Sequence, residues 1–310
     1  MHAEAIALVA AGERARGGTL FVTLEPCDHQ GQTPPCTGAI IGAAVARVVV
    51  GVVDPDARVS GRGIARLQGA GVEVSSGVLA QEVEEADPAY FHHRRTGRPR
   101  LTLKAALTLD GQTAAVDGSS QWITGPGARH DSHLLRASAD AVVVGAGTLI
   151  ADDPALDVRI DGYRGPQPRP VVIAGTRPLP EQLQLWGRNP VVVATARREG
   201  LGEALIVPPG EDGLPDLNSA VLSLGQMGLL EILVEGGSVL AGALWRAELI
   251  DRAVFYIAGT VAGGTGRPVF TTIWPTLDAA KPVEITAVEQ IGPDLKVTFL
   301  THVSRHTPPA

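Results

Sequence analysis

The chain has 310 residues, which is long enough for two domains, each with its own core. Of these residues 45% are hydrophobic and only 4% aromatic, so the cores are expected to consist of Val, Leu, Ile and Ala. Its formal net charge of −7 disfavours general binding to nucleic acids, because no basic stripe offsets the acidic residues. No apolar run approaches the roughly 20 residues of a membrane span, and no targeting pattern is present, so we expect a cytoplasmic protein without a membrane partner.

The first residues combine a candidate metal ligand with a candidate acid–base catalyst. His2 and Glu4 precede an alanine-rich apolar run that predicts a helix over residues 3–11. Residues two apart on a regular helix point to opposite sides, but the first residue of a helix can lie outside helical geometry. In that case both side chains can face one cavity.

The chain's only two cysteines follow within one short segment. Cys27 comes after a strand predicted over 19–24, and Cys36 opens a helical stretch that extends to about residue 45. A strand-to-helix loop therefore delivers both thiolates, and we expect the helix N-terminus to favour the charged form of Cys36.

His2, Cys27, Cys36 and Glu4 are the residues that a hydrolytic zinc deaminase needs. Zinc with three protein ligands keeps a fourth position for water and lowers the pKa of that water to about 7. Glu4, which is not a ligand, would carry the proton from the attacking water to the leaving ammonia. A structural zinc with a closed fourth position and a pair of buried free cysteines are the alternatives, and a reducing compartment disfavours a disulfide.

The rest of the first half alternates helix and strand, which predicts a largely parallel sheet covered by helices. Strands are expected over 47–53 and 72–74, with a glycine-punctuated helix between them and an acidic helix over 81–86 that ends at Pro88. The basic segment 92–99 indicates a solvated linker. Its adjacent His92 and His93 do not converge on a metal. We place the domain boundary in this segment.

From Arg100 a second series of helices and strands begins. Its strands are predicted near residues 101–107, 141–145, 170–174, 190–194, 204–207, 230–234 and 253–257. Two alternating stretches, 282–290 and 294–301, predict a closing hairpin around Gly292 and Pro293. The last residues indicate a solvated tail.

A buried strand, a glycine turn and a helix follow one another over residues 231–242. Glycines let the backbone approach a ligand closely, and a helix N-terminus presents N–H groups to phosphate. Such turns are common, so this one alone does not establish a phosphate site. It also lacks the six-residue dinucleotide fingerprint, as do Gly61 to Gly63 and Gly145 to Gly147, so no Rossmann domain is predicted.

Several motifs together resemble the family of bifunctional riboflavin-biosynthesis deaminase/reductases. The two cysteines, in the motifs 23–27 and 31–36, are separated by eight residues, Asp28 to Pro35, where nucleic-acid deaminases typically have two. The remaining matching motifs cover nearly the whole chain: His2-Ala3-Glu4, Asp54-Pro55, Gly61-Arg62-Gly63, Gly69-Ala70-Gly71-Val72, Lys104-Ala105-Ala106, Leu109-Asp110-Gly111, Ser120-Gln121-Trp122-Ile123-Thr124, Asp152-Asp153-Pro154 and Glu235-Gly236-Gly237.

This resemblance implies an α/β protein with a cytidine-deaminase-like domain followed by a dihydrofolate-reductase-like domain. We expect the zinc deaminase domain over 1–96, the NADPH-dependent reductase domain over 97–304 and a tail over 305–310. In the family two strands and a helix precede the His-Ala-Glu motif, so we expect the deaminase domain here to lack its N-terminal start. The family also tends to self-associate, which implies a homo-oligomer.

The implied activity is hydrolytic deamination of 2,5-diamino-6-ribosylamino-4(3H)-pyrimidinone 5′-phosphate, followed by reduction of its ribosyl group to a ribityl chain with NADPH. His2, Cys27 and Cys36 would bind Zn²⁺, with Glu4 as catalyst. The resemblance implies these NADPH contacts: Ala106, Trp122, Thr148, Asp152, Gly237, Ser238, Val239, Leu240, Ala241, Gly242 and Ala243. It implies these substrate contacts: Ser120, Arg136, Leu156, Arg159 and Glu235.

The residue types fit these implied roles. Arg136 and Arg159 can grip a phosphate through paired N–H donors, and Glu235 can accept hydrogen bonds from ribose hydroxyls or pyrimidine N–H groups. Trp122 can exclude water from the hydride path, and Asp152 can assist proton transfer to the opening sugar ring. The alternatives are structural: a solvated Arg136, a core Trp122 and a helix-capping Asp152.

Three other functions remain open at this point. The nearest is a reductase whose zinc-binding first domain is inactive. A nucleic-acid-editing deaminase would need a basic groove with aromatic residues for stacking, which the charge and the few aromatics disfavour. A non-catalytic zinc module would show an occupied fourth ligand position.

Overall fold

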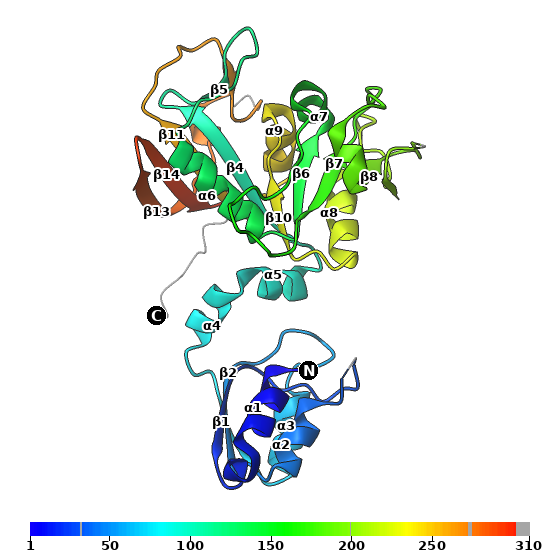
Figure 1. Ribbon diagram of the computed structural model, residues 1–310, viewed down its shortest axis with the longest axis vertical. Helices are drawn as coiled ribbons and strands as arrows, with labels where there is room; N and C mark the ends of the chain where they lie inside the picture. Colours follow the sequence, from blue (N-terminus) through cyan, green and yellow to red (C-terminus); the bar gives the residue numbers. More distant parts are fainter. Residues whose placement is uncertain (32, 199, 272–274, 302–310) are drawn as a thin grey trace. The chain divides into compact units, whose positions relative to one another are not determined.

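The computed structural model describes residues 1–31, 33–198, 200–271 and 275–301. The chain divides into two units, Met1–Thr96 and Gly97–Ala310 (Figure 1). The predicted tail over 305–310 lies outside the described residues. In the part of the chain that is described, no helix is both long and apolar enough to cross a membrane.

The first unit is built on a three-stranded parallel sheet. Its strands β1 (Thr19–Leu24), β2 (Arg47–Val52) and β3 (Glu73–Ser76) lie in the order β1-β2-β3. Both neighbouring pairs are parallel, as the alternation predicts. Apolar side chains of α1 (Ala3–Ala11), α2 (Cys36–Gly42) and α3 (Arg62–Gly69) pack with Val48 and Val50 in one core. Helix α4 (Ala80–Ala86) contacts β2.

The segment predicted as a linker contains a helix, α5 (Pro88–Thr96). Pro88 occupies the first helical position, where a missing N–H costs nothing, and Asp87 Oδ1 accepts the N–H of Tyr90 at 3.2 Å. Phe91 is only 4% exposed. The linker prediction is therefore wrong for most of this segment, because an N-terminal cap and a buried aromatic ring stabilise a short helix.

The second unit is built on a nine-stranded sheet in the order β13-β14-β11-β4-β10-β6-β7-β8-β9 (Figure 1). The bounds are β4 (Arg100–Thr108), β6 (Ala141–Gly145), β7 (Arg169–Ile173), β8 (Val191–Ala194), β9 (Glu203–Ile206), β10 (Glu231–Val234), β11 (Arg252–Ala258), β13 (Glu284–Ile291) and β14 (Asp294–Leu300). From β11 to β9 all neighbours are parallel. The predicted hairpin is confirmed, with Ile291 paired to Asp294 across Gly292 and Pro293. A second, two-stranded sheet of β5 (Gln112–Ala114) and β12 (Arg267–Pro268) was not predicted.

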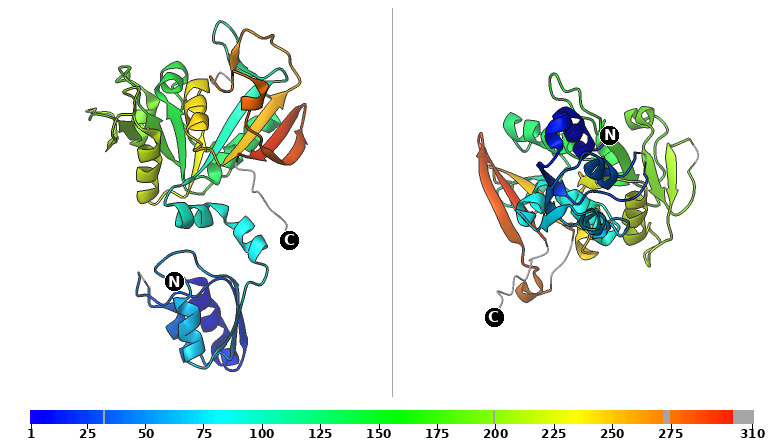
Figure 2. Two further views of the ribbon diagram at one scale, coloured as in Figure 1. Left: turned by 180° about the vertical axis from the view of Figure 1, so that it is seen from behind. Right: turned by 90° about the horizontal axis from the view of Figure 1, so that it is seen from below.

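Helices cover both faces of the large sheet (Figure 2). On one face, apolar residues of α8 (Leu217–Gln226) and α9 (Ser238–Arg246) pack in the same core as the inward residues of the strands. On the other face, residues of α6 (Pro126–Ala137), α7 (Ala146–Asp152) and the 3-10 helix η2 (Gln184–Arg188) join a second core. The described residues also form the 3-10 helices η1 (Gly12–Ala15), in the first unit, and η3 (Leu277–Ala279), in the second.

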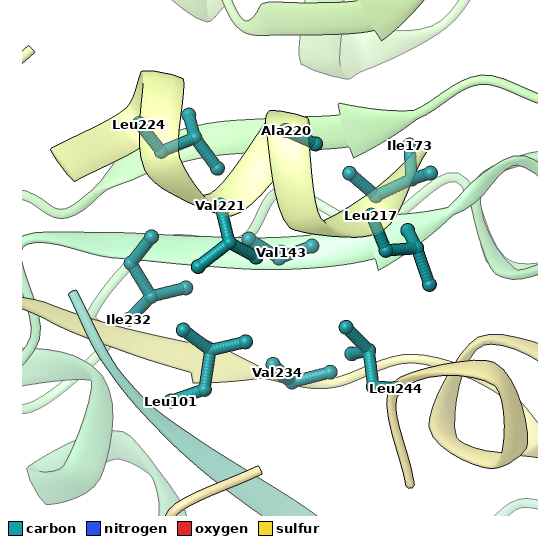
Figure 3. Close-up of a pocket in the computed structure, with 10 residues that line it drawn as sticks. All are labelled: Leu101, Val143, Ile173, Leu217, Ala220, Val221, Leu224, Ile232, Val234 and Leu244. Carbon is teal, nitrogen blue, oxygen red and sulfur yellow. The ribbon is translucent and has the colours of Figure 1, made fainter. Parts of the chain in front are cut away.

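A small apolar cavity lies between α8 and the sheet (Figure 3). It is lined by Leu101, Val143, Ile173, Leu217, Ala220, Val221, Leu224, Ile232, Val234 and Leu244 and has a volume of ≈ 10 Å³. That space would hold about one water molecule, and its lining offers no polar partner. The cavity is a packing feature of the core rather than a substrate site.

The strand order determines where the second unit can bind a ligand. Strand β10 is late in the chain but lies between β4 and β6. Because these three strands are parallel, the segments that follow them meet at one edge of the sheet. Ligands of open α/β sheets bind at such an edge, outside the carboxyl ends of the strands.

Candidate functional site

His2, Cys27 and Cys36 form a cluster at the start of the first unit. Their ligand atoms all lie within 4.8 Å of one another. His2 Nδ1 is 3.2 Å from Cys36 Sγ and 3.5 Å from Cys27 Sγ. His2 has extended backbone angles, φ −73 and ψ 157, directly before α1. The prediction that His2 lies outside helical geometry is therefore confirmed.

The cluster fits zinc. In a tetrahedral site with ordinary zinc–ligand bonds, a nitrogen and a sulfur ligand are about 3.6 Å apart. The distances of 3.2 and 3.5 Å are close to that value. Among the described residues no fourth His, Cys, Asp or Glu completes the group, and no second cluster of this kind occurs. This arrangement differs from a structural site, in which protein closes the fourth position.

Glu4 lies beside the same cluster. Burial of Cys36, and then the negative charge of Glu4, raise the pKa of the Cys36 thiol, and the two side chains interact directly. Burial and Glu4 therefore oppose the thiolate form that the N-terminus of α2 is expected to favour. A bound cation would restore the preference for the thiolate.

The loop that carries Cys27 is tied to α2 and α3. The Cys27 carbonyl accepts the N–H of Thr37 at 3.2 Å, and Cys27 Sγ accepts the N–H of Cys36 at 3.4 Å. Asp28 Oδ1 accepts the Thr37 hydroxyl at 2.5 Å and pairs with Arg66 Nε at 3.0 Å. Both thiol groups are thus held by contacts within the first unit.

In the second unit, Arg136 of α6 meets Glu235, which directly follows β10. Arg136 Nε lies 2.6 Å from Glu235 Oε1, and Nη2 lies 2.9 Å from Oε2. A third bond runs from Arg136 Nη1 to the Asp157 carbonyl at 2.8 Å. Both side chains are 12% exposed, which excludes a solvated Arg136. In the structure, the Arg136 guanidinium that is expected to contact the substrate is paired with Glu235.

Lys104 and His133, which had no role assigned from the sequence, also belong to this region. Burial alone would raise the pKa of Glu235, but Lys104 and then Arg136 lower it to about 2. His133 Nδ1 accepts the backbone N–H of Arg159 at 3.2 Å, and burial followed by Arg136 lowers the pKa of His133. Both residues could have been found from the sequence. Lys104 belongs to the Lys104-Ala105-Ala106 motif, and His133 lies three residues before Arg136, on the same face of the helix.

The other expected substrate contacts differ in exposure. Arg159 is 56% exposed and pairs with Asp157 through a contact of 2.5 Å, so its guanidinium remains accessible to a phosphate. Leu156 is 1% exposed and has a positive φ of 53, so its side chain belongs to the core. Ser120 lies on the exposed surface between β5 and α6.

The glycine turn before α9 is packed against α7. The N–H of Gly237 donates to Thr148 Oγ1 at 2.9 Å. A Cβ at Gly236 would lie 2.9 Å from Leu240 Cδ2, and one at Gly237 would lie 3.1 Å from Thr148 Oγ1. The turn therefore needs small residues, and the first N–H groups of α9 have no acceptor within the helix. Thr148 and the segment 237–243 are brought together as expected.

The remaining expected NADPH contacts are more scattered. Ala106 is half-buried in β4. Asp152 is the last residue of α7, so it does not cap the start of that helix. Desolvation raises the pKa of its carboxyl group. Trp122 is 70% exposed, which excludes a core role, and the Arg129 guanidinium lies 4.6 Å from its ring centre.

A cluster of three possible zinc ligands and an α/β unit whose strand ends converge at one edge are the features expected of a zinc deaminase joined to an oxidoreductase. The first unit matches the family model described as "Cytidine and deoxycytidylate deaminase zinc-binding region" over residues 1–52. The second matches the "RibD C-terminal domain" over residues 99–297. The chain belongs to the RibD family of riboflavin biosynthesis proteins.

Individual relatives agree with this assignment. The chain is 38% identical over 314 residues to the riboflavin biosynthesis protein RibD of Escherichia coli, covering 95% of this chain and 85% of that protein. A structure of Acinetobacter baumannii RibD superposes with a TM-score of 0.90 at 33% identity, covering 97% of this chain and 86% of that one. A Thermotoga maritima deaminase/reductase superposes with a TM-score of 0.86 at 30% identity, covering 97% and 85%.

These comparisons confirm the expected family and the expected fold class, a cytidine-deaminase-like and a dihydrofolate-reductase-like part. They also confirm a bifunctional enzyme of riboflavin biosynthesis, with Zn²⁺ and NADPH as its cofactors. The roles of individual residues, the domain limits and the oligomeric state stay predictions.

Proposed function

We propose that the enzyme deaminates 2,5-diamino-6-ribosylamino-4(3H)-pyrimidinone 5′-phosphate in residues 1–96 and reduces the deaminated product in residues 97–304. The Thermotoga relative is named a diaminohydroxyphosphoribosylaminopyrimidine deaminase/5-amino-6-(5-phosphoribosylamino)uracil reductase, which supports this substrate. We further propose that the protein acts in the cytoplasm as a homo-oligomer.

The observation that carries the first activity is the convergence of three ligand atoms within 4.8 Å, with Glu4 beside them. His2, Cys27 and Cys36 would hold the zinc, which supplies Lewis-acid activation of water when bound. Glu4 would take a proton from that water and deliver it to the departing ammonia. The amino group of the pyrimidine is thereby exchanged for oxygen, with one water consumed.

The second activity needs the nicotinamide held against C1′ of the ribosyl group. The Gly237 turn and Thr148 would bind the phosphates of NADPH at the start of α9, with Ala106, Trp122 and Asp152 nearer the rest of the cofactor. The residues proposed to contact the substrate are Ser120, Arg136, Leu156 through its backbone, Arg159 and Glu235. Arg159 would bind the substrate phosphate, and Glu235 would accept hydrogen bonds from its hydroxyl or N–H groups. Arg136 would hold the Glu235 carboxylate in place.

The two activities can be measured separately on the full chain. Ammonia release reports the first, and NADPH oxidation with the deaminated intermediate reports the second. The variant Glu4→Gln is expected to lose roughly 10²–10⁴-fold in ammonia release while keeping its zinc and its NADPH oxidation. Glu13→Gln, an exposed change in the same unit, is the matched control. A wild-type chain that binds zinc but releases no ammonia would favour the reductase-only alternative.

A further inference from the structure

Glu25 is a buried carboxylate to which the deamination chemistry gives no role. It directly follows β1, lies two residues before Cys27 and is 3% exposed. Four backbone N–H groups donate to it: those of Asp54 at 3.3 Å and Gly61 at 2.8 Å to Oε2, and those of Gly63 at 2.8 Å and Ile64 at 3.1 Å to Oε1. One side chain thus joins the Cys27 loop to the segment between β2 and α3.

The backbone of α3 also approaches the Cys27 loop very closely. A Cβ at Gly63 would lie 1.8 Å from the carbonyl oxygen of Pro26, the residue before Cys27. Only glycine allows this approach, which brings the first turn of α3 within reach of the Glu25 carboxylate. The position of Cys27 therefore depends on how α3 and Glu25 fit together.

A second buried carboxylate extends this arrangement to α5. Asp54, which donates its N–H to Glu25, is 5% exposed. Both of its carboxylate oxygens lie 3.0 Å from the Tyr90 hydroxyl, which donates to them, and Oδ1 also accepts the N–H of Asp56 at 2.8 Å. Tyr90 belongs to α5, and Arg94 of the same helix lies 3.6 Å from Asp56. Helix α5 thus holds the loop that donates to Glu25.

We propose that Glu25 is a positioning residue of the zinc site and that Tyr90, acting through Asp54, supports it. A carboxylate has enough acceptor sites for all four N–H groups, whereas an amide would turn an NH₂ donor toward two of them. Buried N–H groups that lose their acceptor cost free energy, so the loop shifts to recover partners and moves Cys27 Sγ away from His2 and Cys36. This inference rests on the zinc site proposed above.

Zinc affinity of the full chain, measured by competition with a chromogenic chelator, tests the proposal. Glu25→Gln is expected to lower the affinity roughly 10–100-fold, as supporting residues of metal sites do. With Co²⁺ in place of zinc, its visible absorption bands should weaken and shift, because the ligand geometry changes. Tyr90→Phe, which removes one hydroxyl group, should produce a smaller change in the same direction.

Glu84→Gln is the matched control, because Glu84 makes a surface ion pair with Arg95 in the same unit. Equal zinc affinity and equal Co²⁺ spectra for Glu25→Gln and the wild type would overturn the proposal, as would an equal loss in Glu84→Gln. If Glu25→Gln does not fold without metal, the Tyr90→Phe spectrum decides, and an unchanged one overturns the proposal. A wild-type chain that binds no zinc would contradict the zinc site itself.

Discussion

Arg136 and Glu235, 99 positions apart in the chain, form a two-point ion pair with distances of 2.6 Å and 2.9 Å. Both side chains are 12% exposed, so water screens the pair only weakly. Removing Glu235 would leave the buried Arg136 charge without its carboxylate partner, and removing Arg136 would leave Glu235 with Lys104 as its main positive neighbour. The pair fixes a carboxylate at the carboxyl end of β10, where the second unit is expected to bind its substrate.

Arg136→Lys should impair reduction without abolishing the positive charge. Lysine cannot make the planar two-point contact, so the Glu235 carboxylate loses its fixed orientation. We expect kcat/KM for NADPH oxidation with the deaminated intermediate to fall on the order of 100-fold, the usual cost of a misplaced substrate-orienting group. Arg95→Lys, which breaks a comparable pair on the surface, should change it by less than about twofold. Equal rates for the two variants would contradict this role.

The stability contributed by Glu235 should depend on pH. Its folded-state pKa of about 2 lies below the ordinary value of 4.5. The ionised carboxylate therefore contributes stability that is fully present above the ordinary value and is lost as the pH falls toward 2. We expect the difference in unfolding free energy between the wild type and Glu235→Gln, measured in urea, to shrink between about pH 6 and about pH 3. A difference that stays constant over this range would count against the ion pair.

Gly63→Ala should disrupt the first unit. Its Cβ would lie 1.8 Å from a backbone oxygen of Pro26, and no side chain can move to relieve that contact. We expect a loss of stability of at least about 1–3 kcal/mol and faster amide hydrogen exchange in β1 and β2. Gly69→Ala on the same helix meets open space and should stabilise by about 0.5–1 kcal/mol. Similar exchange in both variants would show that the close approach is unimportant.

Removal of zinc should separate the two activities. A strong chelator is expected to abolish ammonia release, because His2, Cys27 and Cys36 lie in the first unit. NADPH oxidation with the deaminated intermediate should persist, since none of these ligands lies in the second unit. Adding zinc back should restore ammonia release in the wild type but not in Cys36→Ser. Ammonia release by zinc-free protein would rule out a metal-dependent deamination.

Much of the fold follows from local sequence patterns. The alternation of apolar runs with turn residues predicted both series of strands, and Gly292 with Pro293 marked the closing hairpin correctly. The spacing of His2, Glu4 and the two cysteines predicted one cluster, which the structure contains. These features could be predicted from the sequence because each depends on neighbouring residues or on the chemistry of a few residue types.

Local patterns failed where burial decides the outcome. The basic segment after Pro88 indicated a linker, yet Phe91 is buried and α5 forms around it. The pKa of the Cys36 thiol likewise depends on burial and on Glu4, which both raise it. Neither the burial of Phe91 nor the desolvation of Cys36 can be predicted before the packing of neighbouring elements is known.

The amino-acid sequence by itself determined the order of the elements, the metal-ligating residue types and the family. Only the tertiary structure placed β10 between β4 and β6, and so brought Glu235 to Arg136 and Lys104. It also showed that Glu25 and Asp54, which belong to the matching motifs but had no assigned role, are buried acceptors of backbone N–H groups. The physical reason is that desolvation and long-range pairing depend on which distant segments exclude water together, and chain order does not specify this locally.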